Sequence, residues 1–422
     1  MLQVAFIKDN KEKVLAGLKK RNFIKLELID EIISLDESRK KIQYDLDSQL
    51  SEINKISKEI GSLMKTGKKE EAEQAKSQTA SLKESSKKLQ QKLAENEEKL
   101  KRSLYEIPNI PNELVPPGTG EADNLEVFKH STNENAISDA LPHWELAKKY
   151  DLIDFELGVK ITGAGFPVYK GKGARLQRSL YQYFLDRNSE AGYTEIIPPF
   201  VVNEASGYGT GQLPDKEGQM YYVNEDNLYL IPTSEVPVTN IYRDELLNAD
   251  QLPIKLTAYS PCFRREAGSY GKEVRGLNRL HQFEKVEIVR IEKPEDSYRA
   301  LDEMVEHVKS LLESLQLSYR ILRLCGGDLG FASAITYDFE VWSAAQKRWL
   351  EVSSVSNFET FQSNRLKLRY RAEGKNQFCH TLNGSSLALP RVLAALLENH
   401  QTETGINIPE VLVPYTGFKS IN

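Results

Sequence analysis

The residues with the clearest chemical potential lie on two strand-like runs that flank a long basic loop rich in glycine. The first run, residues 262–266, carries Arg264 and Glu266, and the second, residues 280–287, carries Phe283. An arginine on a strand can neutralise a phosphate under attack, a carboxylate can accept from an exocyclic amine, and an aromatic ring can stack on a base. These three residues therefore predict a nucleotide site. Without such a site, the charged pair would be a cross-strand surface contact worth ~0.2–1 kcal/mol and the phenylalanine a core residue.

Carboxylates and hydroxyls recur along the chain in short polar groups. Residues 233–235 read Thr-Ser-Glu, Glu287 closes the second strand-like run, and residues 351–354 contain a glutamate and two serines. These groups are candidate ligands for a small polar substrate or a cation, although a solvated strand edge is the usual place for a glutamate. Arg391 falls in the first turn of a predicted helix, where the helix dipole disfavours a cation, so it needs a partner such as a phosphate.

Several classes of site are excluded by what the sequence lacks. No Walker sequence and no GxGxxG follows a strand-like run, so a nucleotide must be bound by another route. Cys262, Cys325 and Cys379 lack the paired short spacing of a zinc site or a disulfide framework. No stretch approaches the ~20 uninterrupted apolar residues of a membrane span. The sequence predicts a cytoplasmic protein without a membrane segment.

These candidate residues would be positioned by strands that follow one another without crossover helices. Strand-like runs occupy residues 194–200, 255–263, 279–291, 335–342 and 348–355, and helical patterns occupy residues 175–188, 295–315 and 390–400. The direct succession of the last two strands favours an antiparallel sheet over a Rossmann arrangement. The predicted fold class is α+β, with a mainly antiparallel sheet flanked by helices.

Two long helices are predicted ahead of this body. Apolar positions across residues 32–63 step alternately by three and four, and the same alternation returns across residues 75–103 after a turn at 66–69. Two such helices must fold back as an antiparallel coiled-coil hairpin. The segment 106–125, which is rich in proline, breaks the helical pattern and is interpreted as a linker.

Charge is divided unevenly between these parts. The chain has a net charge of −5, yet residues 1–105 hold 23 Lys+Arg against 18 Asp+Glu. Small or polar residues at Thr79, Ser86 and Asn96 weaken the seam of the hairpin, while lysines crowd its exterior. A projecting basic rod suits an RNA backbone, which proteins read largely by shape and phosphate position. A dimerisation or spacer coil is the open alternative.

Taken together, these segments resemble the class II aminoacyl-tRNA synthetases. Residues 262–287 resemble motif 2 of that family, and their RGL…HQFEKVE wording is similar to that of the seryl enzymes. Residues 191–199 resemble motif 1, and residues 381–391 resemble motif 3. The resemblance also covers residues 233–235, 327–334, 337–342 and 351–354, so with the hairpin it spans essentially the whole chain.

The resemblance implies a reaction and a domain plan. ATP would activate L-serine as a seryl-adenylate, and the serine would pass to the 3′ end of a serine tRNA with a long variable arm, and to selenocysteine tRNA where that is present. Residues 1–105 would form the tRNA-binding arm, 106–125 the linker and 126–422 the catalytic domain. Motif 1 would form the interface of a homodimer.

The resemblance also assigns roles to individual residues. Arg264 and Arg391 would be catalytic, gripping the α- and γ-phosphates of ATP. The implied ATP site consists of Arg264, Arg265, Glu266, Phe283, Glu351, Val352, Ser353, Ser354 and Arg391. The implied serine site consists of Thr233, Ser234, Glu235, Glu287 and Ser385. Glu351 and Ser354 would hold Mg²⁺, and the predicted tRNA contacts are Lys68, Lys69, Lys76 and Lys83.

The chain departs from the family pattern in motif 3. Ser386 and Pro390 stand where close relatives often carry glycine, although proline is tolerated in the first turn of a helix. Two alternatives stay open at this point: a class II synthetase or carrier-protein ligase for another small amino acid, and a non-catalytic coiled-coil RNA-binding protein. Amino-acid-dependent ATP–pyrophosphate exchange would separate the three functions.

Overall fold

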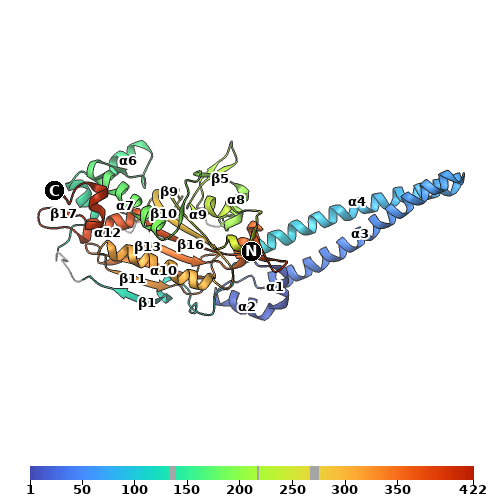
Figure 1. The fold of residues 1–422 in the computed structure, drawn as a ribbon, viewed down its shortest axis with the longest axis horizontal. Helices are drawn as coiled ribbons and strands as arrows, with labels where there is room; N and C mark the ends of the chain where they lie inside the picture. Colours follow the sequence, from blue (N-terminus) through green and yellow to red (C-terminus); the bar gives the residue numbers. More distant parts are fainter. Residues whose placement is uncertain (133–138, 216–217, 267–274) are drawn as a thin grey trace. The chain divides into compact units, whose positions relative to one another are not determined.

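The computed structural model describes residues 1–132, 139–215, 218–266 and 275–422 (Figure 1). These residues form two compact units. The N-terminal unit contains Met1–Lys19 and Phe23–Pro108, and the body contains Lys20–Asn22 and Asn109–Asn422. Most of the predicted Gly-rich loop, residues 267–274, lies outside the described residues.

The N-terminal unit is dominated by two helices of 38 residues each, α3 (Leu28–Lys65) and α4 (Lys69–Glu106), which follow the short helices α1 (Val4–Asp9) and α2 (Lys11–Lys20). The two long helices pack antiparallel, which confirms the predicted hairpin. Gly67 closes the turn between them with φ +78°, a conformation that favours glycine.

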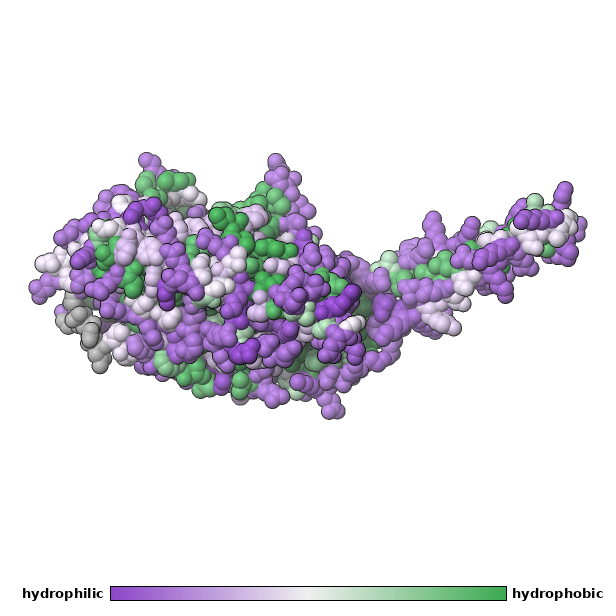
Figure 2. Space-filling view, viewed as in Figure 1, coloured by the Kyte–Doolittle hydropathy of each residue, from purple (hydrophilic) through white to green (hydrophobic). Residues whose placement is uncertain are grey.

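The hairpin seam is partly polar. Ile53 and Ile56 of α3 are buried, as are Thr79 and Ser86 of α4. The Ser86 hydroxyl donates to Gln49 Oε1 at 3.2 Å, so at least part of this polar seam is paired internally. Figure 2 shows hydrophilic residues over most of the visible exterior of these helices.

The body is built on an eight-stranded sheet with the order β1-β11-β12-β13-β16-β10-β9-β4. Every neighbouring pair is antiparallel except β4 with β9, which confirms the predicted mainly antiparallel α+β fold. The strands of this sheet are β1 (Leu125–His130), β4 (Thr194–Glu195), β9 (Ile254–Phe263), β10 (Gln282–Glu292), β11 (Tyr319–Arg323), β12 (Ile335–Ser343), β13 (Arg348–Asn357) and β16 (His380–Ala388).

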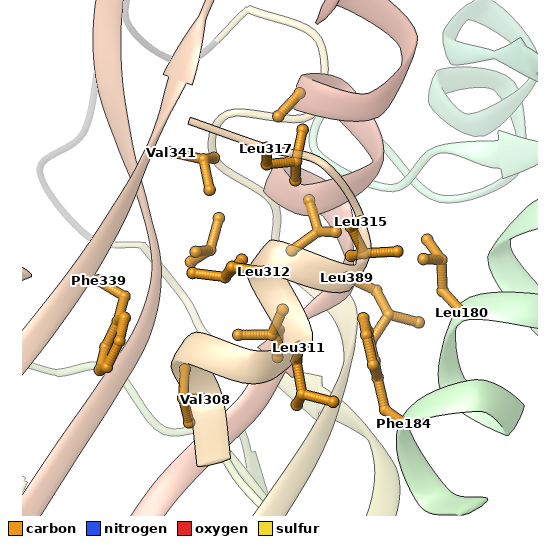
Figure 3. Packing of buried hydrophobic residues seen from close by; sticks show 14 of the residues in the cluster. Leu180, Phe184, Val308, Leu311, Leu312, Leu315, Leu317, Phe339, Val341 and Leu389 are labelled. Atoms are coloured by element: carbon orange, nitrogen blue, oxygen red, sulfur yellow. The ribbon is translucent and has the colours of Figure 1, made fainter. Parts of the chain in front are cut away.

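Three helices cover the sheet and bury its apolar side chains: α7 (Gly171–Glu190), α10 (Ser297–Ser314) and α12 (Leu389–Asn399). Figure 3 shows Phe184 of α7, Leu311 of α10 and Leu389 of α12 within one cluster, into which Phe339 projects from the sheet. Among the described residues, no helix has the length and apolarity that crossing a membrane requires.

Shorter elements complete the body. Its other helices are α5 (His143–Lys149), α6 (Phe155–Ile161), α8 (Glu204–Thr210), α9 (Glu235–Asn240), α11 (Thr360–Leu366) and α13 (Val413–Thr416). Its other strands are β2 (Ile153–Asp154), β3 (Val168–Tyr169), β5 (Val201–Asn203), β6 (Tyr222–Val223), β7 (Leu228–Leu230), β8 (Leu246–Asn248), β14 (Arg369–Ala372), β15 (Lys375–Phe378), β17 (Ile406–Asn407) and β18 (Ser420–Ile421).

The predicted strand at residues 194–200 is wrong over most of its length. Only β4, two residues long, pairs with β9, and the chain then leaves the sheet. Pro198 and Pro199 have no backbone N–H to donate to a neighbouring strand, which explains the early end. The other long strands and the three covering helices agree with their predicted ranges to within a few residues.

The proline-rich segment after the hairpin is packed rather than loose. Ile107 and Ile110 are buried. The Asn109 side chain donates to the carbonyl oxygens of Ala332 at 3.0 Å and Phe358 at 2.9 Å. The chain from Asn109 onward is therefore packed as part of the body.

Candidate active site

A cavity of about 680 Å³ in the body is lined by residues of β10, β13 and β16 and by Arg264, which directly follows β9. Antiparallel pairing places Phe283 of β10 opposite Cys262 of β9, and Glu287 of β10 opposite Ser385 of β16. Residues far apart in the sequence thereby line one space. The loop between β11 and β12 forms a further wall through residues 328–333.

One end of the cavity carries the group that predicted a nucleotide site. The Arg264 guanidinium lies 5.2 Å from the centre of the Phe283 ring, and its Nε donates to the Pro232 carbonyl at 3.4 Å. Glu266 accepts from Arg279 Nε at 2.5 Å. The end therefore presents a cation, an aromatic face and a paired carboxylate side by side.

Arg391 enters the cavity from the first turn of α12 and is anchored by backbone carbonyls. Its Nε donates to Asn278 O at 3.0 Å and its Nη1 donates to Glu351 O at 2.9 Å. The Glu351 carboxylate is 3.7 Å from Nη1 and does not close a hydrogen bond. Carbonyl partners leave the positive charge of Arg391 available to an anion.

The floor of the cavity is a buried ion pair. Lys285 Nζ lies 2.5 Å from Glu287 Oε2, and their side chains are 8% and 2% exposed. Residues two apart on a strand share a face, so β10 presents both charges to the cavity. The Thr233 hydroxyl donates to the same Glu287 oxygen at 3.2 Å. The carboxylate is therefore held by a cation and a hydroxyl.

Glu235 is the second buried carboxylate of the floor, and it opens α9. Gln362 Nε2 donates to Glu235 Oε1 at 2.7 Å, and the Thr381 hydroxyl donates to Gln362 Oε1 at 2.7 Å. Burial, together with the neighbouring charge of Glu287, raises the pKa of Glu235 to about 7. A cationic ligand between the two carboxylates would relieve both effects.

A second pair of carboxylates lies where β12 meets β13. Asp338 is paired in register with Ser354, and its Oδ1 is buried without a hydrogen-bond partner. Burial and the charge of Glu351 hold the pKa of Asp338 well above its usual value. Within the described ranges, no group of three or more His, Cys, Asp or Glu residues has the geometry of a metal site. The oxygen donors of Glu351 and Ser354 nevertheless fit a hard cation whose remaining ligands are water molecules or phosphate oxygens.

The structure brings nearly all the predicted ATP and serine residues to this one cavity. Arg265 and Ser234 are outside its lining. The Arg265 side chain is exposed, whereas the fully buried Ser234 hydroxyl donates to Ala258 O at 3.4 Å. The predicted tRNA contacts Lys68, Lys69, Lys76 and Lys83 are exposed on the hairpin.

Sequence reasoning missed several residues of the cavity. Lys285 lies in the motif 2 segment but had no assigned role, although its spacing of two from Glu287 was a usable signal. Asn383 lies in the motif 3 segment but had no assigned role. Gln362, which bonds Glu235 without lining the cavity, carries no motif, and only the fold brings it here. Residues 328–333 belonged to a recognised segment but had no assigned role.

The departures in motif 3 have structural explanations. The Ser386 hydroxyl is fully buried and donates to Asn188 Oδ1 at 2.8 Å. Asn188 Oδ1 also lies 2.6 Å from His307 Nε2, and Asn188 Nδ2 donates to Thr257 Oγ1 at 2.9 Å. Burial lowers the pKa of His307 to about 4, so the neutral ring donates through Nε2. Pro390 lies in the first turn of α12, where a backbone N–H has no helical partner.

This network reaches the cavity floor through β9. The Thr257 hydroxyl donates to the backbone carbonyl of Glu287 at 3.0 Å. Asn188 therefore joins α7, α10, β9 and β16, and it supports from behind the strand that carries Lys285 and Glu287. Ser386 supplies one of its bonds.

Comparison with known proteins gives matches over both units. Residues 220–400 match the tRNA synthetase class II core domain (G, H, P, S and T), and residues 1–111 match the seryl-tRNA synthetase N-terminal domain. A serine–tRNA ligase of Salinibacter ruber is 51% identical over 100% of this chain and 99% of its own length. One from Akkermansia muciniphila is 47% identical over 100% of this chain and 99% of its own length.

Similarity to solved structures is equally extensive. The crystal structure of seryl-tRNA synthetase from Pyrococcus horikoshii complexed with ATP superposes with a TM-score of 0.91 at 32% identity, covering 100% of this chain and 99% of that one.

The Asn188 network predicts unequal costs for its members. Ser386→Ala removes one donor, and Asn188 Oδ1 keeps His307, so we expect a loss of about 0.5–1.5 kcal/mol in the free energy of unfolding. Asn188→Ala removes the partner of the Ser386 hydroxyl and of His307 Nε2, and one of the two bonds of the Thr257 hydroxyl, so it should cost at least about twice as much. Urea denaturation of both variants measures the difference. Equal losses would show that Asn188 is not the centre of the network.

Proposed function

The chain belongs to the seryl-tRNA synthetase family, and from this premise we propose how its cavity and its helical hairpin share one reaction. It is a serine–tRNA ligase, which binds ATP and joins serine to tRNA. The observation that best supports a division of labour within the cavity is its charge pattern. Arg264 and Arg391 line it as partly exposed cations, whereas the carboxylates Glu235 and Glu287 in its lining are buried.

We propose that the first step is an in-line attack of the serine carboxylate on the α-phosphorus of ATP. The new bond forms the seryl-adenylate, and pyrophosphate leaves with the electron pair of the broken P–O bond. Arg264 would neutralise the α-phosphate, where negative charge develops, and Arg391 would bind the γ-phosphate. The adenine ring would lie on Phe283, with its amine toward Glu266.

Mg²⁺ would be held by Glu351 and Ser354, with Asp338 behind them. The ion would screen the charge of the ATP phosphates and fix their geometry. Its fit rests on the unpartnered Asp338 oxygen and on the repulsion between Asp338 and Glu351.

Serine would bind on the floor, among Thr233, Glu235, Glu287 and Ser385. The two carboxylates supply acceptors for the ammonium and the hydroxyl, while the hydroxyls complete the polar surface. A site that bonds a substrate hydroxyl rejects the analogue that lacks it by roughly 10⁴–10⁵, because its buried groups lose their partner. Alanine is thereby rejected. Threonine must be excluded by lack of space for its methyl group.

In the second step the 3′-hydroxyl of the tRNA would attack the seryl-adenylate carbonyl, releasing AMP. The hairpin would hold the long variable arm of a serine tRNA, and of selenocysteine tRNA where that exists. Lys69, Lys76 and Lys83 follow one another at intervals of seven and are exposed, so they share one face of α4. Glu73 pairs with Lys76 at 2.5 Å, but such an exposed pair is worth little and yields readily to phosphate.

Motif 1 would pair two copies of the chain. Ile197 is 85% exposed in this single chain, and Phe200 and Val201 beside it are also exposed. An exposed apolar group of this kind indicates a surface that another molecule covers. A homodimer is the proposed partner state.

Activation should depend on Arg264. We expect Arg264→Ala to lower the rate of serine-dependent ATP–pyrophosphate exchange by at least ~10²-fold. This is the order found when one hydrogen-bond donor to the charge of a transition state is removed. Arg299→Ala is the control, because its side chain is 73% exposed and forms local ion pairs with Asp296 and Glu303. A folded Arg264→Ala chain with near wild-type exchange would refute this role, and exchange driven by another amino acid instead of serine would refute the substrate.

Serine binding should weaken in acid. The ionised form of Glu235 binds an ammonium, and a pKa of about 7 means that protonation competes below neutrality. The KM for serine should therefore rise about fivefold from pH 7 to pH 6 and change less above pH 7. The KM for ATP is the internal control. In Glu235→Gln the serine KM should be raised but nearly independent of pH, and a flat wild-type profile would remove this carboxylate from the ammonium site.

The hairpin should matter for transfer and not for activation. Replacing residues 31–100 by a short Gly/Ser linker should leave exchange within about tenfold of wild type, ~1.4 kcal/mol, while charging of tRNA collapses. Changing Lys68, Lys69, Lys76 and Lys83 to alanine should weaken tRNA binding and flatten its salt dependence, because fewer counterions are released.

A matched set of exposed lysines from the body provides the control for that experiment: Lys149, Lys347, Lys367 and Lys375. Alanine at these four positions should leave the salt dependence of tRNA binding nearly unchanged. If the deletion variant charges tRNA as well as the intact chain, the hairpin is a spacer.

A further inference from the structure

Arg21 lies behind one wall of the cavity, and its side chain binds the backbone of that wall. Its guanidinium donates to the carbonyls of Leu329 at 2.6 Å, Gly330 at 2.8 Å and Ser333 at 3.0 Å, with a longer contact of 3.4 Å to Asn109. Burial lowers the pKa of Arg21 to about 10, so it stays charged at neutral pH. The planar guanidinium spreads its donors over separate nitrogens and can serve several spaced acceptors at once, whereas a lysine carries its three donors on one nitrogen.

The loop at residues 326–334 is shaped to receive this segment. A Cβ on Gly326 would lie 2.0 Å from the Lys20 carbonyl oxygen, and one on Gly327 would lie 2.7 Å from Asn22 Nδ2. A side chain at position 326 would push the loop away from the Lys20 backbone, and one at position 327 would clash with the Thr119 backbone and the Asn22 side chain. The two glycines therefore permit the close approach that brings Arg21 to its carbonyl acceptors.

The other face of the same loop lines the cavity through Phe331 and its neighbours. The Phe331 ring packs edge-on against Phe361, with centroids 5.8 Å apart. Gln362, the next residue of α11, donates to Glu235. A continuous set of contacts thus runs from the loop that Arg21 holds to the carboxylate on the cavity floor.

We propose that Arg21 is a positioning residue for serine. By fixing loop 326–334, it sets the Phe331–Phe361 contact and, through Gln362, the place of the Glu235 carboxylate. This inference rests on the proposed serine site. It gives the segment just before the hairpin a part in amino-acid activation, separate from any contact with tRNA.

Exchange kinetics test the proposal in the full-length chain. Arg21→Ala should raise the KM for serine about tenfold or more, while the KM for ATP changes less than about threefold. Arg21→Lys keeps the charge but cannot span the acceptors. Its KM for serine should therefore lie between those of wild type and Arg21→Ala. Gly326→Ala disturbs the same contact from the loop side and should also raise the serine KM. Lys19→Ala, an exposed neighbour, is the control and should match wild type.

The outcomes separate a positioning role from a general loss of structure. A serine KM within about twofold of wild type in folded Arg21→Ala would overturn the proposal. A fall in kcat with both KM values unchanged would also overturn it, because that pattern reports a smaller fraction of active protein. If Arg21→Ala does not fold, Arg21→Lys and Gly326→Ala decide by the same comparison. Wild-type protein without serine-dependent exchange would instead refute the proposed function.

Discussion

The ion pair between Lys285 and Glu287 is the contact on which the rest of the active site depends. Two opposite charges on one face of a buried strand cost desolvation energy, and removing either would leave the other unpaired in a region of low dielectric. The surrounding polar groups follow from that constraint. Thr233 donates to Glu287, and burial together with the charge of Glu287 raises the pKa of Glu235. Specific recognition of a small zwitterion is a natural use for so much buried polarity.

Support for this floor comes from behind it. Asn188 links α7, α10 and β16 to β9, which in turn bonds the backbone of Glu287. Arg21 holds a second wall through three close carbonyl contacts. Neither residue lines the cavity, yet both restrict how its walls can shift. Precise placement of reacting groups requires such outer contacts, because an error of about 1 Å can cost ~10² in rate.

The sequence predicted the elements whose periodicity is strong. Apolar residues spaced alternately by three and four predicted the hairpin. Strand-like runs that follow one another without a crossover helix predicted the antiparallel sheet. The segment 194–200 was misread because apolar content suggested a strand, whereas its two prolines could not extend the ladder. Motif resemblance located most of the cavity lining, but it assigned no role to Lys285, Gln362 or Arg21. Their importance comes from contacts across long stretches of chain, which a local pattern does not encode. Ser386 was recognised as a departure, and only its buried partner Asn188 explains it.

The polar seam of the hairpin has a consequence for how its lysines are presented. Each long helix has 38 residues, which at 1.5 Å per residue makes a rod of about 57 Å. A slip of one residue between the helices would rotate one against the other by roughly 100° and separate Ser86 from Gln49. Buried polar contacts of this kind fix the register of coiled coils at some cost in stability. The hairpin thereby keeps a constant angular phase, with Lys69, Lys76 and Lys83 facing one direction at intervals of about 10.5 Å.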